Sequence, residues 1–320
     1  MRVAACWSLV AAGLTALAHA DDYPDRPIRV VVGFSPGGGA DAAARVVGQT
    51  LRERWGHPAV VDNRPGAGGN LAADLVAKAS PDGYTLLVSS PGPIAVNPAL
   101  YGQLPYDPQK DLAPVTLIAQ GANVLVVHPS MPATSVSALI ELARSKPRGL
   151  NYASSGVGST PHLCAELFKL AANIKGTHVP YKGAGPAVID LVAGRVDFML
   201  VSIPSILSQV KAKRLKALAV TSRERSSVLP ELPTLAEAGL PGYEATVWWG
   251  LWAPAGAPAA IVRTLNTTVV SSLKDAAVRE RLARGGAEVV GNSAQEFAAF
   301  IRAETLKWSD VIKKAGIRRQ

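Results

Sequence analysis

Short apolar, β-branched segments alternate with amphipathic segments along the first third of the chain. Residues 28–33 predict a buried strand, and residues 40–54 carry apolar side chains at the three- and four-residue spacing of a helix. A second strand at 59–62, a helix at 71–79 and a third strand at 85–90 follow. This alternation predicts a parallel sheet covered by helices, and therefore an α/β fold.

The same alternation returns after a proline-rich stretch at residues 91–114. This second part predicts strands at 124–128, 150–154, 178–181, 196–201 and 217–221, and helices at 136–145, 161–172 and 183–192. Loops rich in glycine or serine open two of these helices, as a glycine-rich loop does in the first part. The chain therefore predicts two α/β lobes with the same kind of strand-to-helix loop.

The last part of the chain predicts a strand at 247–253 and helices at 258–273, 277–284 and 294–314. Because these helices need a sheet to cover, we expect the chain to return to the first lobe. Residues 124–127 and 247–252 would then be paired crossover strands. The expected first lobe comprises residues 21–125 together with 249–320, and the second lobe comprises residues 126–248.

The N-terminus carries the features of an export signal. Arg2 precedes an apolar run at residues 3–17, and Ala18-His19-Ala20 forms a small-residue cleavage site. The run is shorter than the ~20 residues that a spanning helix needs. We therefore expect residues 1–20 to be a signal peptide that is cleaved after Ala20, which leaves an exported protein.

Composition narrows the class further. The chain is 48% hydrophobic and 18% charged, which is typical of a globular protein, and Cys164 alone remains after cleavage, so an intrachain disulfide is excluded. The formal net charge is +9, and its densest basic cluster, at 211–216, has no interleaved aromatic residues. This pattern disfavours a nucleic-acid partner. It fits either a solvated basic face or a field that gathers small anions.

The loop after the first strand matches the nucleophile elbow of serine hydrolases, G-x-S-x-G, at Gly33-Phe-Ser-Pro-Gly37. In such an elbow, the backbone N–H of the residue after the serine helps to form the oxyanion hole. Here that residue is Pro36, which has no N–H. The sequence therefore argues against a hydrolase.

The same loop also matches a dinucleotide-binding turn, G-x-G-x-x-A, at residues 37–42. Asp62 follows about twenty residues later, where a ribose-binding acid belongs. Soluble dinucleotides are scarce outside the cytoplasm, and Asp62 equally fits a turn at the end of a strand, so this alternative stays open. No lysine of P-loop type follows the glycines, and the histidines lack metal-ligand spacing, so we expect neither cofactor nor metal.

Both patterns share one property, which is backbone N–H groups at the start of a helix. Glycines 37–39 bring such groups to a helix N-terminus in the first lobe, and residues 155–160 before Pro161 do so in the second. Two anion-binding helix ends in two lobes predict a cleft for a ligand with a carboxylate at each end. The alternative is that both loops are tight turns with helix caps.

Six segments in this order resemble the Bug family of periplasmic solute receptors, the substrate-binding components of tripartite tricarboxylate transporters. The segments are YPDRPIRVVVGFSPGGGAD, VVDNRPGAGGN, ASPDGYTLL, YASSGVGSTPHL, HVPYKGAGPAVIDLVAGRVDF and GYEATVWWGLWAPAGAP. The resemblance implies a type II periplasmic-binding-protein fold, in which two crossover strands join two α/β lobes around a ligand cleft. It also implies a periplasmic monomer that binds a small carboxylate or dicarboxylate and delivers it to permease subunits or to a sensor.

The resemblance also implies the site residues. In the first lobe these are Phe34, Pro36, Gly37, Gly38, Asp41, Ser89, Ser90 and Asn97. In the second lobe they are Ser154, Gly158, Ser159, Thr160, His162, Tyr181, Lys182 and Asp197. No catalytic residue is implied.

Several of these residues also have a structural interpretation. Asp41 lies in the first turn of a helix, where an acid is favoured in any case, and Asp197 could end a helix–strand turn. His162 could serve packing, Lys182 could be solvated, and the three tryptophans at 248, 249 and 252 could pack a crossover or floor the cleft. The alternative function is an exported or dinucleotide-binding enzyme that reuses an α/β fold.

Overall fold

The structure is a computed structural model that describes residues 23–284 and 286–314. The expected signal peptide, residues 1–20, lies outside the described residues. No helix in the described ranges is long and apolar enough to cross a membrane.

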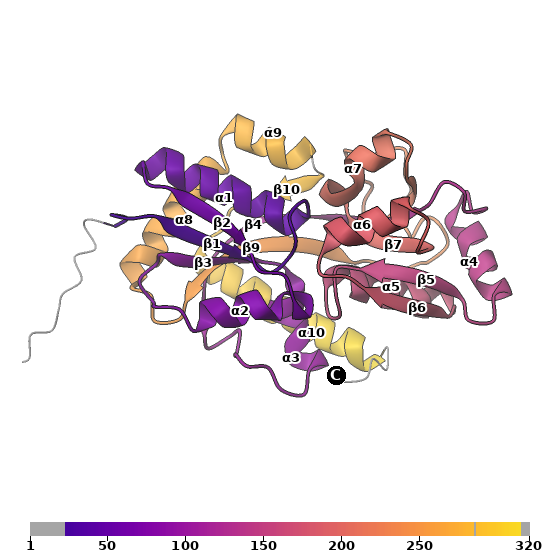
Figure 1. Ribbon diagram of the computed structural model, residues 1–320, viewed down its shortest axis with the longest axis horizontal. Coiled ribbons are helices and arrows are strands. Elements are labelled where there is room, and N and C mark those ends of the chain that lie inside the picture. Colours follow the sequence, from indigo (N-terminus) through magenta and orange to yellow (C-terminus); the bar gives the residue numbers. More distant parts are fainter. Residues whose placement is uncertain (1–22, 285, 315–320) are drawn as a thin grey trace, which may run out of the picture.

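Strands and helices alternate along nearly the whole described chain (Figure 1). The strands are β1 (Ile28–Val32), β2 (Ala59–Asn63), β3 (Thr85–Ser89), β4 (Leu112–Val127), β5 (Leu150–Ser154), β6 (Gly176–Pro180), β7 (Phe198–Ser202), β8 (Lys216–Val220), β9 (Thr246–Pro254) and β10 (Ala287–Val289). The α-helices are α1 (Gly39–Trp55), α2 (Asn70–Ala77), α3 (Asn97–Leu100), α4 (Val136–Ser145), α5 (Thr160–Ala172), α6 (Ala184–Val192), α7 (Ile203–Lys211), α8 (Ala259–Ser272), α9 (Ala276–Arg284) and α10 (Ala294–Lys314). A 3-10 turn, η2 (Ala67–Gly69), and a π-helical turn, η3 (Gly92–Val96), complete the set.

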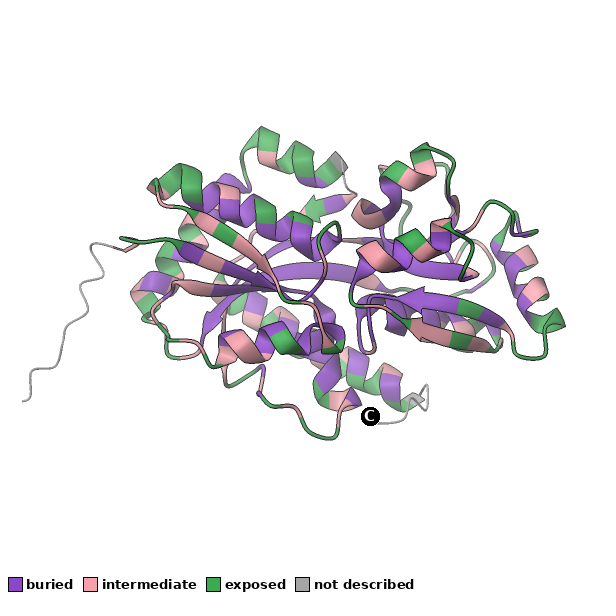
Figure 2. Cartoon of the chain, in the orientation of Figure 1, coloured by how far each residue is buried: buried purple, intermediate pink, exposed green. Residues whose placement is uncertain are grey.

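Parallel strands form the centre of each lobe. In the first lobe β1 lies between β2 and β3, and in the second lobe β5 lies between β6 and β7, with all these pairs parallel. Helices connect the parallel strands and cover the sheet, as Figure 1 shows. Figure 2 shows that the strands are largely buried, whereas the outer faces of the helices are exposed. The α/β alternation predicted from the sequence is therefore correct.

Two long antiparallel strands, β4 and β9, join the two lobes. β4 pairs with β9 from Leu112 to Ala122, and then with β7 and β8 of the second lobe from Asn123 onward. Residues 124–127 and 247–252 were expected to be the two crossover strands, and they lie in β4 and β9. β9 pairs with the earlier half of β4, because β4 begins inside the proline-rich stretch, where no strand was predicted.

The terminal helix α10 packs against η3 and β4, and a buried carboxylate ties it to β9. Oε2 of Glu304 accepts hydrogen bonds from the indole nitrogens of Trp248 on β9, at 2.8 Å, and of Trp308, at 2.9 Å. Both tryptophan side chains are fully buried. A single acid thus ties the last helix to a crossover strand, which explains why Trp248 is a packing residue.

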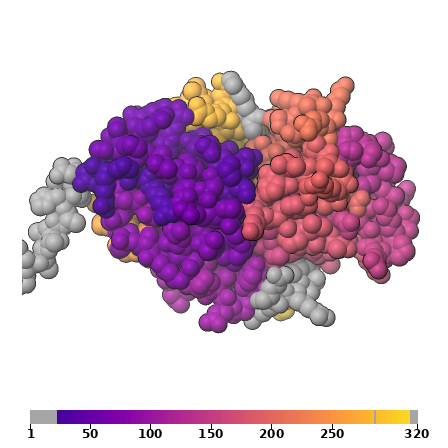
Figure 3. Space-filling model, in the orientation of Figure 1, coloured from indigo at the N-terminus to yellow at the C-terminus, as the bar shows by residue number. Residues whose placement is uncertain are grey.

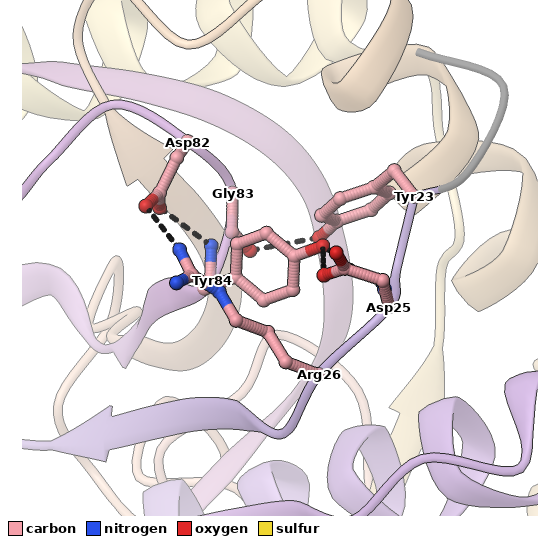
Figure 4. Close-up of polar contacts among 6 residues, drawn as sticks. All are labelled: Tyr23, Asp25, Arg26, Asp82, Gly83 and Tyr84. Atoms are coloured by element: carbon pink, nitrogen blue, oxygen red, sulfur yellow. Dashed lines mark hydrogen bonds and ion pairs between the residues drawn. The ribbon is translucent and has the colours of Figure 1, made fainter. Parts of the chain in front are cut away.

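The segment that enters β1 is clamped to the turn before β3 (Figure 4), at the end of the first lobe that points away from the second lobe (Figure 1). The hydroxyl of Tyr23 donates to the carbonyl of Gly83 at 2.7 Å, and Tyr84 donates to Asp25 at 2.6 Å. The guanidinium of Arg26 pairs with Asp82 and lies 4.2 Å from the centre of the Tyr84 ring. Burial raises the pKa of Tyr23, so this phenol stays a hydrogen-bond donor.

This clamp predicts unequal costs for its two ends. Tyr23→Phe leaves the carbonyl of Gly83 without a donor in a half-buried place, and we expect a loss of about 1 kcal/mol in the free energy of unfolding. Arg26→Gln breaks an exposed ion pair, and the expected loss is below about 0.5 kcal/mol. Equilibrium urea unfolding measures both. A larger loss for Arg26→Gln would contradict this account of the clamp.

Candidate functional site

A cavity lies where the two lobes meet, beside the crossover strands. Its walls are Phe34, Gly38, Gly39, Ala40, Ser90, Asn123, Ser155, Ser159, Thr160, Pro161, Ala184, Val201, Ser202, Ser205, Val247 and Trp249. None of these lining residues carries a formal charge. The cavity therefore combines apolar surface with hydroxyls, one amide and backbone groups.

Four helices begin at this cavity. The N-caps of α1, α5, α6 and α7 are Gly38, Ser159, Gly183 and Ser202, and none of the four caps its helix with a side-chain hydrogen bond. Each helix follows a parallel strand, and such helices all start at the same edge of their sheet. Their first backbone N–H groups have no partner within the helix, and each N-terminus carries roughly half a positive charge. The cavity is thus electropositive without a cation in its wall.

Asp41, in the first turn of α1, holds the loop before this helix by hydrogen bonds. The carboxylate of Asp41 accepts from the backbone N–H of Gly37 at 3.1 Å, from Arg45 at 2.9 Å and from Asn63 at 3.1 Å. Burial alone would raise the pKa of Asp41, but these hydrogen bonds outweigh burial and hold it below its ordinary value. Asn63 also donates to the carbonyl of Phe34 at 2.9 Å. Asp41 therefore shapes the loop and does not line the cavity.

The loop before α5 is held by hydroxyls and by a histidine. Nδ1 of His162 accepts the backbone N–H of Gly158 at 3.2 Å, and the hydroxyl of Ser159 donates to the carbonyl of Gly156 at 2.6 Å. Ser154 accepts the N–H of Gly156 and contacts Nε2 of His178 at 2.6 Å. The two imidazoles stack with centres 4.2 Å apart. His162 therefore accepts a hydrogen bond from the loop.

The structure brings five of the sequence-predicted site residues to the cavity wall, namely Phe34, Gly38, Ser90, Ser159 and Thr160. Others lie around it. Pro36 and Gly37 are exposed at the mouth, Lys182 is exposed there too, and Ser89 and Asn97 are buried behind the wall. Ser154, Gly158, Asp41 and His162 belong to the supporting loops described above.

Two predicted residues lie elsewhere. The hydroxyl of Tyr181 donates to Asp190 on α6 at 2.7 Å, and burial and this contact raise its pKa to about 12. Asp197 accepts the backbone N–H of Asn151 at 2.7 Å. Asn151 and Asp197 lie at the starting ends of β5 and β7, whereas the cavity lies at the far ends of these strands. Neither side chain is part of the cavity wall, and Asp197 has the turn role that was its alternative interpretation.

The mouth of the cavity is a close seam between the lobes, visible in Figure 3 where the first-lobe surface in purple meets the second-lobe surface in red. The hydroxyl of Ser35 donates across this seam to the carbonyl of Lys182 at 2.7 Å. A Cβ on Gly68 would lie 2.1 Å from the carbonyl oxygen of Val157, and one on Gly92 would lie 2.8 Å from that of Gly158. Glycines therefore allow the two backbones to meet.

Hydrogen bonds in the structure argue against both patterns in the opening loop, the nucleophile elbow and the dinucleotide-binding turn. The hydroxyl of Ser35 is engaged with a backbone carbonyl, and Pro36 supplies no N–H, so the loop does not form a nucleophile elbow. Asp62 accepts from Arg29 at 2.8 Å and from Arg64 at 3.0 Å, and it is absent from the cavity wall. The dinucleotide alternative thus loses its ribose-binding acid. Among the described residues, no cluster of acids, histidines and cysteines is placed to hold a metal ion.

Sequence reasoning missed several wall residues. Ser202 is the N-cap of α7 and Ser205 lies in its first turn, and this helix was not predicted, although the segment Ser202-Ile-Pro has proline near a helix start, as Ser159-Thr-Pro does. Asn123 lies inside the otherwise apolar part of β4, which gave no signal. Trp249, for which the sequence left a place in the core or in the cleft open, lines the cavity, and a Cβ on Gly39 would lie 2.2 Å from its ring. Glycine at position 39 therefore lets α1 start directly against this indole.

The role of Asp41 predicts an indirect effect on binding. Asp41→Ala removes the acceptor that holds the N–H of Gly37, and we expect the affinity for the ligand to fall at least tenfold, which corresponds to about 1.4 kcal/mol. Asp62→Ala is the matched control, since this acid lies on the neighbouring strand but away from the cavity. For Asp62→Ala, isothermal titration calorimetry should give an affinity within about twofold of that of the unchanged protein. Equal losses for both variants would contradict the assigned role.

The two stacked histidines predict a dependence of stability on pH. Burial lowers the pKa of His162 to about 4 and that of His178 to about 3, below the ordinary value of 6.5. Between these values the unfolded chain binds more protons than the folded one, so stability is full above pH 6.5 and falls as the pH drops toward 4. We expect His162→Asn to reduce the difference in unfolding free energy between pH 7 and pH 5 by on the order of 1–2 kcal/mol. An unchanged difference would contradict the prediction.

Comparison with known proteins extends over nearly the whole chain. The family model for the tripartite tricarboxylate transporter family receptor matches residues 43–317. The protein BugT of Bordetella pertussis is 39% identical over 311 residues, which are 97% of this chain and 95% of BugT.

Solved structures of similar sequence share the fold. Rpa4515 of R. palustris, solved with adipate, has a TM-score of 0.90 at 43% identity and covers 93% of this chain and 99% of its own. MatC of Rhodopseudomonas palustris, solved with malate, has a TM-score of 0.87 at 36% identity, with 91% and 100% covered. The periplasmic binding protein BugD has a TM-score of 0.89 at 34% identity, with 93% and 100% covered. The expected periplasmic-binding-protein fold is therefore confirmed.

Proposed function

Because the chain belongs to the tripartite tricarboxylate transporter receptor family, we propose that it is an exported receptor for a small dicarboxylate. The ligand would lie in the cavity between the lobes, with carboxylates facing the first turns of the four helices. The two similar proteins solved with adipate and with malate support a ligand of this class. The observation that carries the proposal is the convergence of four uncapped helix N-termini on one uncharged cavity.

The electrostatics fit a dianion. Four helix ends of roughly half a charge each amount to about two positive charges, which match two carboxylates. A carboxylate that leaves water must recover its hydrogen bonds, and free backbone N–H groups and hydroxyls provide them here. The same positive ends disfavour a cationic ligand, and a sugar would gain little from them.

The proposal includes a set of roles for the predicted site residues. Phe34, Gly38, Ser90, Ser159 and Thr160 would contact the ligand, whereas Asp41, Asn97, Ser154, Gly158 and His162 would hold the loops that do so. Pro36, Gly37 and Lys182 would close the mouth. This assignment rests on the cavity wall and on the hydrogen bonds beneath it.

The cellular role follows from the family and from the N-terminus. We propose that the signal peptide is cleaved after Ala20 and that the mature monomer works in the periplasm. It would deliver its ligand to the permease subunits of a tripartite transporter, or to a sensor, without catalysis. The lobes would comprise residues 21–125 with 249–320 and residues 126–248, and the change in pairing along β4 at Asn123 supports a boundary there.

A ligand screen tests this function directly. We expect dicarboxylates to raise the thermal unfolding midpoint of the purified protein, because a ligand at one hundred times its Kd adds ~2.7 kcal/mol to stability. Sugars and cationic amino-acid derivatives should leave the midpoint unchanged. Stabilisation by sugars and by no carboxylate would contradict the proposal, and turnover of the bound acid, seen by mass spectrometry, would favour an enzyme.

The first-lobe loop provides a sharper test. A Cβ on Gly38 would lie 3.7 Å from Ala184, and the backbone of Gly38 has φ −94°, so a larger residue is compatible with the fold. In Gly38→Val the additional methyl groups would occupy the cavity, and we expect the affinity for the dicarboxylate to fall at least ~100-fold, about 2.7 kcal/mol. Gly102→Val is the matched control, because no atom lies within 4 Å of a Cβ there. Unchanged affinity in Gly38→Val would move the site away from this loop.

A further inference from the structure

Two buried polar groups in the cavity wall lack hydrogen-bond partners among the described residues. They are Oδ1 of Asn123 on β4 and Oγ1 of Thr160 at the start of α5. Both residues line the cavity, and their exposed fractions are 0% and 1%. Buried polar atoms in native proteins are rarely left unpaired, so such a pair in a cavity wall points to a group that the ligand supplies.

The surroundings fix Asn123 in place and set it against α5, the helix that carries Thr160. Nδ2 of Asn123 donates to the sulfur of Cys164 at 3.3 Å, which leaves its carbonyl oxygen as the unused end. The backbone of Asn123 is fixed by Thr221, which accepts from its N–H and donates to its carbonyl, each at 2.9 Å. Cys164 lies four residues after Thr160 on α5, so the two share one face of the helix, and this face meets Asn123.

The two free atoms have complementary chemistry. The oxygen of Asn123 accepts only, whereas the hydroxyl of Thr160 has a proton to donate. A hydroxyl group matches both at once, since it accepts from Thr160 and donates to Asn123. A carboxylate oxygen would repel the carbonyl oxygen of Asn123, and an ammonium group would lie against the positive ends of the helices.

We propose that Asn123 and Thr160 form a subsite for a hydroxyl group on the carbon chain of the bound acid. This inference rests on the proposed function and adds a substrate class to it, namely hydroxy-dicarboxylates. The carboxylates would bind to the helix ends, and the hydroxyl subsite would select among acids of equal charge. An apolar pair such as leucine and valine would fill the same space but would not distinguish a hydroxy acid from its deoxy analogue.

Matched pairs of acids test the subsite by calorimetry. The probes are malate with succinate, 2-hydroxyglutarate with glutarate, and 2-hydroxyadipate with adipate, each hydroxy acid as both enantiomers. In the unchanged protein we expect one hydroxy acid to bind at least tenfold more tightly than its unsubstituted analogue. In Asn123→Leu and in Thr160→Val this preference should fall to about twofold or less, because only the hydroxy acid has a hydroxyl group that loses its hydrogen bond there.

Ser205→Ala is the control within the cavity. Its hydroxyl lies 2.9 Å from that of Ser202, at the start of α7, so its loss should weaken both acids of a pair equally and keep their ratio. Circular dichroism checks that each variant is folded, and the more conservative Thr160→Val keeps the test valid if Asn123→Leu does not fold. Equal affinity for both acids in every pair that binds, or a preference that survives in a folded variant, would overturn the subsite. Binding of none of the six acids would overturn the proposed function itself.

Discussion

One constraint governs the proposed site, which is that a charged ligand would have to leave water without meeting a formal charge in the cavity wall. Four helix N-termini meet this constraint together, because α1, α5, α6 and α7 all begin at the cavity and none is capped by its own side chain. Their arrangement follows from the topology, since helices that follow parallel strands start at the same edge of the sheet. Two lobes that face each other with these edges would then enclose the proposed ligand from both sides. An arginine would supply stronger attraction, but a set of dipoles would bind an anion with less desolvation of the protein itself.

The side chains behind the cavity keep these helix ends available. Asp41 and Asn63 hold the loop before α1, and His162 with Ser159 holds the loop before α5. At the mouth, Gly68 and Gly92 have no side chain that would keep the lobes apart. Most of the hydrogen-bonding side chains near the site therefore hold the loop backbones in place, and the N–H groups at the helix starts face the cavity.

Most of the fold could be predicted from the sequence, but only part of the site could. The helix starts of α1 and α5 were predicted because glycines or serines stand between a strand and an amphipathic segment. α7 was missed because it begins immediately after β7, without a glycine loop, and Asn123 was missed because β4 is apolar around it. Asp41 and His162 were expected to contact the ligand, and in the structure they accept hydrogen bonds from Asn63 at the end of β2 and from the backbone of Gly158, contacts that the sequence alone does not show. Asp197 was expected in the site only from the resemblance, whereas the strand predicted at 196–201 already places this residue near its start, at the end of β7 opposite to the cavity.

The most direct test of anion binding by the helix N-termini is a titration of the ¹⁵N-labelled protein with a dicarboxylate. The backbone amide signals in NMR spectra are recorded at each ligand concentration. The account predicts that the largest downfield proton shifts occur in the first turns of α1, α5, α6 and α7, at one stoichiometric equivalent of ligand. Because hydrogen bonds to a carboxylate deshield an amide proton, these shifts report the contacts themselves. Shifts confined to a single lobe, or centred on the basic cluster at residues 211–216, would contradict the claim that helix N-termini from both lobes bind the anion.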